Sequence, residues 1–115
     1  MDLRVAAAIS MMQQLKDGNL SIVDLSKKVN LSPSRLWQLF RKETGQSPKQ
    51  YLKTMRMQRA RKLLEETFLS IKEIAFLSGS TDISHFVRDF KKGCGVTPKE
   101  FRSKSRAIGK ENNHE

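Results

Sequence analysis

Apolar residues recur at helical spacing along most of the chain, and no stretch shows the sustained alternation of a β-strand. Leu36, Leu39 and Phe40 fall on one side of a helix, and Phe86 and Phe90 repeat this arrangement later in the sequence. Because residues three and four positions apart share a helix face, the pattern predicts amphipathic helices packed around apolar cores. The predicted fold class is all-α.

Residues that begin and end helices bound these stretches. Four segments open with a hydroxyl residue that is followed three positions later by Asp, Glu or Gln, at Ser21, Ser47, Ser70 and Thr97. Two further N-caps are expected at Ser32 and Asp82. The helical patterns stop at residues suited to a positive φ, namely Gly18, Asn30, Gly45, Gly79 and Gly95.

These signals together predict about seven helices. We expect them at residues 3–16, 21–29, 33–44, 48–66, 71–78, 83–93 and 98–105. Residues 106–115 are polar and unpatterned, and we expect them to form a flexible tail.

The segment at residues 32–51 occurs twice, because residues 82–101 repeat it. Identical residues stand at the pairs Ser34/Ser84, Phe40/Phe90, Lys42/Lys92, Gly45/Gly95, Pro48/Pro98 and Lys49/Lys99. In each copy a short helix, a turn and a second helix follow one another, which is the helix-turn-helix pattern. The sequence therefore predicts two helix-turn-helix subdomains, at residues 1–46 and 68–105, joined by a long linker helix within 47–67.

The chain carries 22 Lys and Arg against 12 Asp and Glu, a formal net charge of +10. Such a charge attracts polyanions, nucleic acid first and anionic membrane surface second, although it can also serve solubility alone. No apolar run approaches ~18 residues, so no membrane span is expected. The two His and the single Cys lie far apart and provide neither a nucleophile–base pair nor a metal cluster. An enzyme, a metal site and a cofactor are therefore not predicted.

The second helix of each copy, which we call the recognition helix, can enter the major groove of DNA with its N-terminal half. The inward stripe leaves side chains on the outer face that suit contact with base edges. In the first recognition helix these are Ser34, Arg35, Trp37 and Gln38; in the second they are Ile83, Ser84, His85, Val87 and Arg88. Side chains suited to phosphate contact are Arg41, Lys42, Lys49, Lys91, Lys92 and Lys99.

Two of these positions, Trp37 and His85, allow a second interpretation. The Trp37 ring has the alternative of folding back onto the domain, but Leu36 and Phe40 already fill the inward face, which favours exposure. His85 has the alternative of being a plain surface residue. Asp89 stands where the first copy has Leu39, and we expect a basic partner for it, with the long helix as one source.

The motifs "LSPSRLWQLFRKETGQSPKQYL", "RMQRARKLLEE" and "SIKEIAFLSGSTDISHFVRDFKKGCGVTPKEF" resemble the DNA-binding domain of AraC/XylS-family bacterial transcription regulators, over residues 9–101. The resemblance implies that residues 1–105 form one such domain and that its recognition helices enter successive major grooves. It also implies base-reading roles for Ser34, Trp37, Gln38, Ser84, Val87 and Arg88. The chain departs from the family pattern at Ser80, where an aromatic residue is usual, and at Asp89, where an apolar one is usual.

The expected function is sequence-specific binding of double-stranded DNA by a cytoplasmic, nucleoid-associated transcription regulator. Two unequal tandem units in one chain predict an asymmetric site bound by a monomer, with the recognition helices ~34 Å apart along the duplex. RNA polymerase is a further candidate partner, and no membrane partner is expected. The alternative function is that of a non-specific basic architectural protein, which would not need the doubled motif. The sequence fits both a stand-alone regulator and a part of a longer one.

Overall fold

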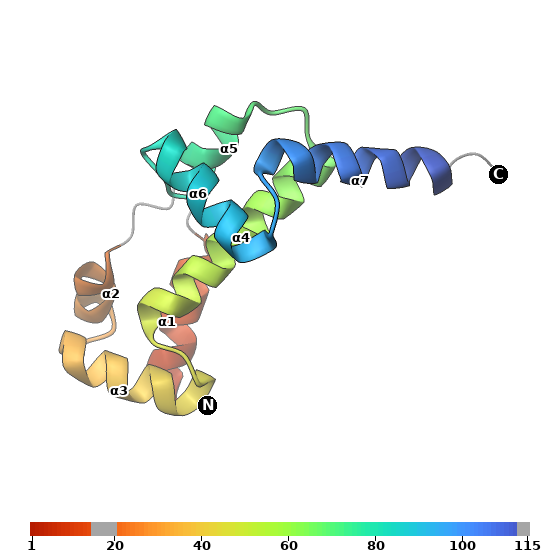
Figure 1. Cartoon of the computed structure of the whole chain (residues 1–115). Coiled ribbons are helices and arrows are strands. Elements are labelled where there is room, and N and C mark those ends of the chain that lie inside the picture. The colour runs from red at the N-terminus through yellow and green to blue at the C-terminus, as the bar shows by residue number, and fades with distance from the viewer. Residues whose placement is uncertain (15–20, 113–115) are drawn as a thin grey trace. The chain divides into compact units, whose positions relative to one another are not determined.

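The computed structural model describes residues 1–14 and 21–112 of the chain, in which seven helices and no strand occur (Figure 1). The helices are α1 (Leu3–Gln14), α2 (Ile22–Lys28), α3 (Pro33–Thr44), α4 (Pro48–Glu66), α5 (Ile71–Leu77), α6 (Ile83–Cys94) and α7 (Pro98–Asn112). The prediction of an all-α fold is confirmed, and most helix bounds agree with the sequence signals to within a residue or two.

The two ends of the chain need separate comment. The expected end of the first helix at Lys16, and Gly18 beyond it, lie outside the described residues. The expected end of the last helix at residue 105 was wrong, because α7 continues to Asn112. Residues 106–112 are polar and lack apolar spacing, so helical periodicity did not indicate a helix there. In the structure, Arg102 and Arg106 of α7 donate hydrogen bonds to the backbone carbonyls of Leu64 and Thr67.

The helices begin where the capping residues stand. The hydroxyl groups of Ser21, Ser32 and Ser70 each accept a hydrogen bond from the backbone N–H three residues later, at 3.1 Å. Asp82 does the same with its carboxylate at 3.2 Å. At Ser70 the Glu73 side chain also accepts from the Ser70 backbone N–H, which completes a capping box. These bonds satisfy backbone donors that a helix start leaves without partners.

The chain divides into two compact units, Met1–Arg56 and Met57–Glu115, and α4 belongs to the first with its beginning and to the second with its end. Each unit has its own apolar core. The core of the first unit consists of Val5, Ala8, Met12, Leu25, Val29, Leu36, Phe40 and Leu52. The core of the second unit consists of Ala60, Leu64, Ile74, Ala75, Phe86 and Phe90.

Small residues allow the first helix of each helix-turn-helix to lie close to its neighbours. Ser26 in α2 and Ala75 in α5 are both 1% exposed. The Ser26 hydroxyl donates to the backbone carbonyl of Val23 at 2.7 Å, so it is buried without losing its hydrogen bond.

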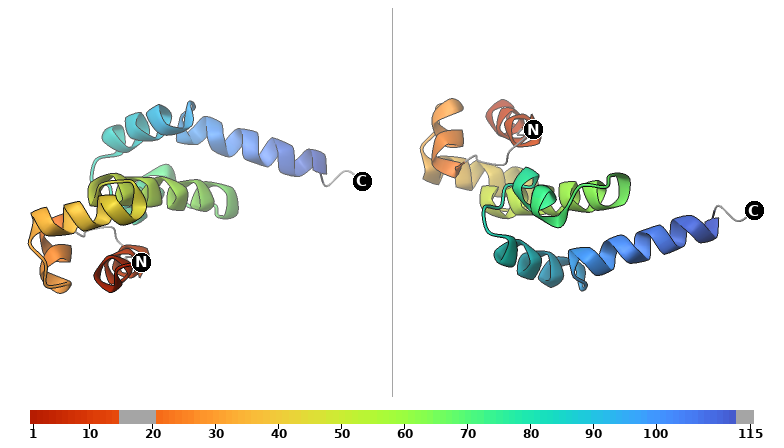
Figure 2. Two further views of the ribbon diagram at one scale, coloured as in Figure 1. Left: turned by 90° about the horizontal axis from the view of Figure 1, so that it is seen from below. Right: turned by 90° about the horizontal axis from the view of Figure 1, so that it is seen from above.

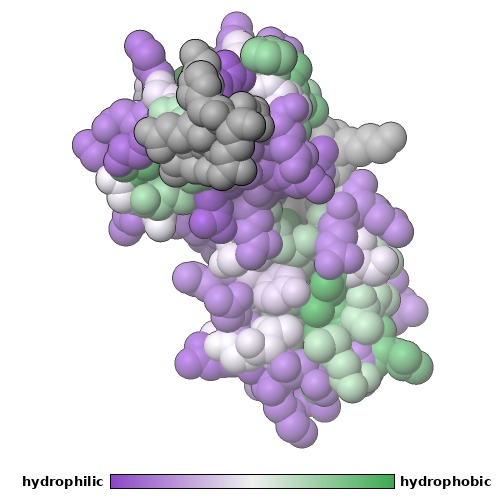
Figure 3. Space-filling view, turned by 90° about the vertical axis from the view of Figure 1, so that its right-hand side faces the viewer, coloured by the Kyte–Doolittle hydropathy of each residue, from purple (hydrophilic) through white to green (hydrophobic). Residues whose placement is uncertain are grey.

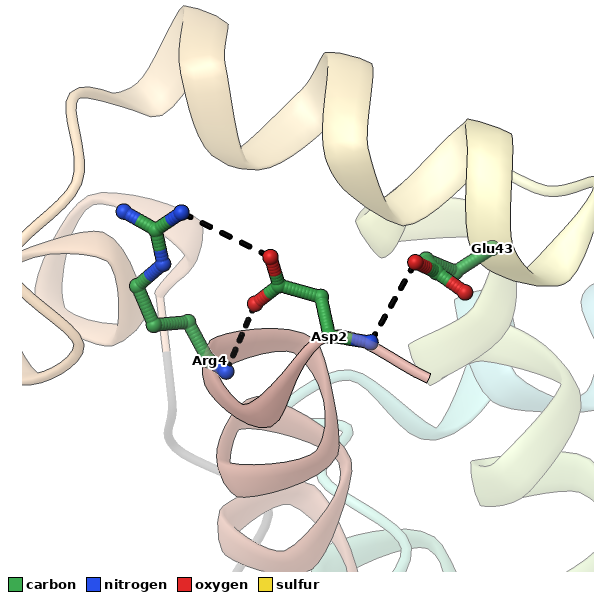
Figure 4. Close-up of polar contacts among 3 residues, drawn as sticks. All are labelled: Asp2, Arg4 and Glu43. Carbon is green, nitrogen blue, oxygen red and sulfur yellow. Dashed lines mark hydrogen bonds and ion pairs between the residues drawn. The ribbon is translucent and has the colours of Figure 1, made fainter.

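A polar contact ties the beginning of the first unit to its recognition helix (Figure 4). The Asp2 carboxylate accepts from the Arg4 backbone N–H at 2.8 Å and caps α1, which lowers the pKa of Asp2. The Asp2 backbone N–H donates to the Glu43 carboxylate at 3.2 Å. The N-terminal end of α1 is therefore fixed near the C-terminal end of α3.

The outer side of α1 differs from the basic surface expected of a DNA-binding face. Met1 and Leu3 are 71% and 86% exposed. Figure 3 shows hydrophobic side chains gathered at the lower right of one face of the molecule. None of the described helices combines the length and apolar character that crossing a membrane would require.

Candidate nucleic-acid interface

The turns before the two recognition helices begin with the same backbone geometry. Asn30 and Gly79 have φ values of 57° and 90°, the left-handed conformation that Gly and Asn adopt most readily. The Leu31 N–H donates to the Ser26 carbonyl, and the Ser80 N–H donates to the Ala75 carbonyl, both at 2.9 Å. Each first helix thus ends in a Schellman motif, which reverses the chain toward the recognition helix.

After this shared start the two turns diverge. Leu31 packs against the core of the first unit and is followed directly by the N-cap Ser32. Its counterpart Ser80 donates its hydroxyl to the Asp82 carbonyl at 3.0 Å, and one further residue separates it from the N-cap. The longer turn replaces an apolar contact by a local hydrogen bond.

In the first unit, the core determines which face of α3 points outward. Leu36 and Phe40 are fully buried, and the Phe40 ring meets Tyr51 edge-on at 5.1 Å between centroids. The predicted base-reading residues Ser34, Arg35, Trp37 and Gln38 are all exposed.

Trp37 does not fold back, since it remains 45% exposed. The Arg41 guanidinium lies over its ring, 5.3 Å from the centroid. A cation–π contact of this kind restrains both long side chains on the outer face of α3.

In the second unit, Phe86 and Phe90 of α6 take the places of Leu36 and Phe40. The predicted residues Ile83, Ser84, His85 and Arg88 are exposed. Arg88 Nε donates to the Ser84 carbonyl at 3.4 Å, which holds the start of its side chain along the helix.

Val87, the counterpart of Trp37, lies differently from the other predicted residues. It is half-buried and packs against the second core. The equal spacing of the two copies therefore did not make these two side chains equally accessible.

Asp89 has a basic partner on α6 itself. Its carboxylate lies 3.5 Å from His85 Nδ1, one turn earlier on α6. Residues four positions apart are neighbours on a helix surface, so the pair forms within the recognition helix itself. The four-residue spacing of His85 and Asp89 in the sequence is the signal that indicates this pair.

The six predicted phosphate-contact residues all have exposed side chains, with three in each unit: Arg41, Lys42 and Lys49, then Lys91, Lys92 and Lys99. Four of them stand in the last turn of a recognition helix, where a cation also interacts favourably with the helix dipole. Each unit thus presents one outer helix face with hydrogen-bonding groups at its N-terminal half and positive charge toward its C-terminal end.

No group of three His, Cys, Asp or Glu among the described residues is placed to hold a metal ion. Cys94 is half-buried and packs against the second core.

Two arginines to which the sequence analysis assigned no role make long-range contacts. Arg102 and Arg106 of α7 donate to backbone carbonyls at the end of α4. The signal that would have indicated them is the absence of a basic residue in the last turn of α4.

Comparison with known proteins agrees with this arrangement. A family model described as a helix-turn-helix domain matches residues 25–104. The arabinose operon regulatory protein of Escherichia coli K12 is 38% identical over 90% of this chain and 36% of its own length. The chain spans about a third of the length of the curated relatives it matches.

Solved structures match over most of both chains. A transcriptional regulator from Chromobacterium violaceum, described as containing an AraC-type DNA-binding domain, is 30% identical with a TM-score of 0.81. This match covers 90% of this chain and 92% of that one. The DNA-binding domain of the global transcriptional factor AdpA, solved in complex with a target DNA, is 25% identical with a TM-score of 0.87, covering 91% and 95%.

Proposed function

Because this chain belongs to the AraC/XylS family of helix-turn-helix transcription regulators, we propose that it binds double-stranded DNA sequence-specifically and regulates transcription through α3 and α6. The observation that carries the proposal is the outer face of these two helices. In each, aromatic or aliphatic anchors are buried, while side chains with hydrogen-bonding groups remain exposed on the same turns. A rigidly held helix with such a face is what direct reading of base edges requires.

In the first unit, Arg35 and Gln38 supply the hydrogen-bonding chemistry. A guanidinium pairs with guanine in the major groove, and a carboxamide pairs with adenine. Trp37 adds an apolar surface for a thymine methyl group, and Ser34 can bond to several bases.

In the second unit, Arg88 is the principal candidate for guanine, and its bond to the Ser84 carbonyl starts the side chain along the outer face. Ser84, His85 and Ile83 stand on the first turn of α6, the part of a recognition helix that meets base edges. Val87 contributes less surface than Trp37, since it is half-buried.

The exposed cations Arg41, Lys42, Lys49, Lys91, Lys92 and Lys99 are proposed to contact phosphates. Such contacts orient the protein on the duplex without reading sequence, and they release bound counterions. Binding should therefore weaken steeply as salt rises.

The two recognition helices are proposed to occupy successive major grooves, ~34 Å apart, in an asymmetric site. The chain would bind as a monomer, act on chromosomal DNA in the cytoplasm and offer its remaining surface to RNA polymerase. No observation favours the alternative of a non-specific architectural protein, whose wedge side chains would have to insert between base steps.

The proposal is tested by selecting bound sequences from a random duplex pool and then comparing two variants on the selected site. Arg88→Ala should lose discrimination at one base pair, about 1–3 kcal/mol or roughly 5- to 150-fold. Lys92→Ala should weaken cognate and scrambled DNA alike and reduce the salt slope by about one phosphate contact.

Recovery of an asymmetric consensus would support the proposed site. Equal losses on cognate and scrambled duplexes for both variants would reject base reading by Arg88, and failure to select any consensus would reject sequence-specific binding.

A further inference from the structure

The C-terminal end of α4 bears partial negative charge, and the last turn of this helix contains no basic residue to offset it. The last turn of a helix leaves carbonyl groups without intrahelical partners and bears partial negative charge. α4 has no basic residue in this turn and ends on Glu65 and Glu66. By contrast, α3 ends with Arg41 and Lys42 in its own last turn.

Two arginines of α7 bring positive charge to this end, where the two helices pass one another (Figures 1 and 2). Arg102 Nε donates to the Leu64 carbonyl at 3.2 Å, and its Nη2 donates to the Thr67 carbonyl at 3.3 Å. Arg106 Nη2 donates to the same Thr67 carbonyl at 3.1 Å. We call this arrangement, Arg102 and Arg106 on the carbonyls of Leu64 and Thr67, the α7 clamp.

The chemistry of the clamp is particular to arginine. A planar guanidinium holds several donors in a fixed fork, so Arg102 bridges two carbonyls that a lysine ammonium could not span in the same way. Burial lowers the pKa of Arg102, and the charge of Arg106 lowers it further. Two like charges are thus held close together, which is favourable only because the negative end of α4 faces both.

Phe68 extends the clamp into the loop after α4. Its ring is 92% exposed, and the Arg106 guanidinium carbon lies 4.7 Å from the ring centroid. An exposed ring gains little from burial, and its cation–π contact with Arg106 restrains it. The loop is tied to α7 by its backbone at Thr67 and by its side chain at Phe68.

The repeat accounts for only one arginine of the clamp, since Arg106 corresponds to Arg56 in the first copy and Arg102 has no such counterpart. Leu52 stands at the position of Arg102 in the first copy, and it is buried in the apolar core of the first unit. An arginine here is therefore a feature of the second unit alone.

The position of the clamp gives it a role in the second helix-turn-helix. The clamped loop leads directly into α5, which begins at Ile71, and α6 leads through a short turn into α7. α7 therefore connects the end of α4 to the end of α6, so the α5–α6 pair is held at both of its chain ends.

We propose that Arg102 and Arg106 are positioning residues for the recognition helix α6, acting through the carbonyls of Leu64 and Thr67 and not through contact with DNA. The inference rests on the proposed function, because it presupposes that α6 reads bases. Removing the clamp loosens α5 and α6 from the end of α4. Base contacts made by α6 are lost first, since they depend on geometry more than phosphate contacts do.

The test uses the duplex selected with the wild-type chain and two sets of altered duplexes, one changed in the half read by α6 and one in the half read by α3. Arg102→Met keeps the stem of the side chain and removes the fork. Lys104→Met is the matched control, because it removes one exposed positive charge from the same helix. Competition binding is measured for each variant at several salt concentrations.

Arg102→Met is expected to lose about tenfold of its preference in the α6 half, the size of one lost base discrimination. Its preference in the α3 half and its salt slope should match the wild type, and Lys104→Met should keep both preferences. Arg102→Lys should behave like Arg102→Met in preference, because a restored charge does not restore the fork.

Several results would overturn the inference. A salt slope lowered by about 0.9 in Arg102→Met would mark a phosphate contact instead. Unchanged preference in the α6 half, or equal loss in both halves, would also reject it. If amide exchange shows that Arg102→Met does not fold, Arg102→Lys and Arg106→Met decide by the same criteria. A wild-type chain without any base preference would reject the proposed function itself, whereas a selective wild type with an unaffected variant rejects only the clamp.

Discussion

The two helix-turn-helix units share their anchors and differ in what surrounds them. Phe40 and Phe90 are both fully buried, and each meets the aromatic ring of the following helix edge-on. Around these anchors, however, the first unit has Val29 and Leu39 where the second has Ser78 and Asp89. A recognition helix can therefore pack with polar residues at the edge of the core, provided that its two aromatic or aliphatic anchors remain buried.

The outer faces differ as a consequence. The first unit exposes Trp37 under the Arg41 guanidinium, whereas the second keeps Val87 half-buried and pairs His85 with Asp89 along its own helix. The first recognition helix exposes the larger apolar side chain, and under the proposed function the second would depend more on Arg88. This difference is the physical basis for expecting an asymmetric DNA site.

The largest effect should come from removing the shared anchors one at a time. Phe40→Ala and Phe90→Ala should each cost about 3–5 kcal/mol, since each leaves a cavity in a separate core. Trp37 is the single Trp of the chain, so its fluorescence reports on the first unit. Phe40→Ala should lower the urea midpoint of the Trp37 signal more than Phe90→Ala does.

Amide exchange in α5 and α6 provides the complementary measurement, and it should respond more strongly to Phe90→Ala. If both variants shifted the Trp37 signal equally, the units would unfold as one block, and the comparison between two cores would fail.

Substitutions at two equivalent positions, one in each unit, test the polar residue at the edge of the second core. Ser78 and Val29 hold the same C-cap position of α5 and α2, and both are buried. Within the described part of the chain, the Ser78 hydroxyl has no hydrogen-bond partner. Ser78→Ala should therefore stabilise the protein by about 1 kcal/mol, because it removes a buried unsatisfied group. Val29→Ser should cost about 2 kcal/mol, measured by urea unfolding.

A loss of stability in Ser78→Ala would contradict this expectation. It would mean that the Ser78 hydroxyl forms a hydrogen bond in the folded protein. Ser78 would then stabilise the edge of the second core, as Val29 stabilises the edge of the first.

Substitution of two glycines in the second unit, Gly93 and Gly95, should have a smaller effect on stability. Gly93 lies inside α6, where α3 has Glu43, and an added Cβ would meet no atom within 4 Å. Gly93→Ala should raise stability by about 0.5–1 kcal/mol, because Ala loses less backbone entropy in a helix. Gly95→Ala is the control, with φ at 81° and an expected cost of about 1 kcal/mol. If thermal unfolding showed that Gly93→Ala and Gly95→Ala shift the Tm in the same direction, the contrast between the helical Gly93 and the positive-φ Gly95 would be refuted.

The smallest expected effect is the weakening of the N-terminal cap of α7 at low pH. Glu100 of α7 accepts from the Thr97 hydroxyl at 2.8 Å and from the Thr97 backbone N–H at 3.2 Å, and these bonds lower its pKa. The corresponding residue at the start of α4 is Gln50, which does not titrate. A carboxyl whose pKa is lowered by folding contributes stability above its unfolded pKa, and this contribution is lost as pH falls through the folded value.

Acid should therefore weaken the cap of α7 below about pH 4.5, the ordinary pKa of Glu, and leave the cap of α4 unaffected. Amide exchange of the first turn of each helix, followed from pH 6 downward to about pH 3, measures this difference. Glu100→Gln should remove the acid-dependent part. Parallel weakening of both caps would show that Glu100 is not its source.

The helices could be predicted because their boundaries depend on short-range chemistry. Ser32 and Ser70 form their bonds to residues three positions away, and Gly45 and Gly95 adopt positive φ without help from distant parts of the chain. The buried anchors Phe40 and Phe90 could also be predicted, since helical spacing determines which residues share a face.

Other features of the site could not be predicted in the same way. Val87 and Trp37 occupy equal places in the repeat, yet the smaller side chain settles against its core and the larger one remains outside. The contact of Asp89 with His85 was one of several that the sequence allowed, since other cations also lay within reach by spacing.

Local hydrogen bonds and helical periodicity depend on neighbouring positions, so the sequence alone predicts the helices of the described residues, the two copies of the recognition helix and their buried anchors. The length of α7 and the contacts of Arg102 and Arg106 depend instead on how distant segments pack together. Their partners, the carbonyls of Leu64 and Thr67, are backbone atoms that every residue possesses. No pattern of side chains marks such acceptors, and they become specific only when folding brings the end of α4 beside α7.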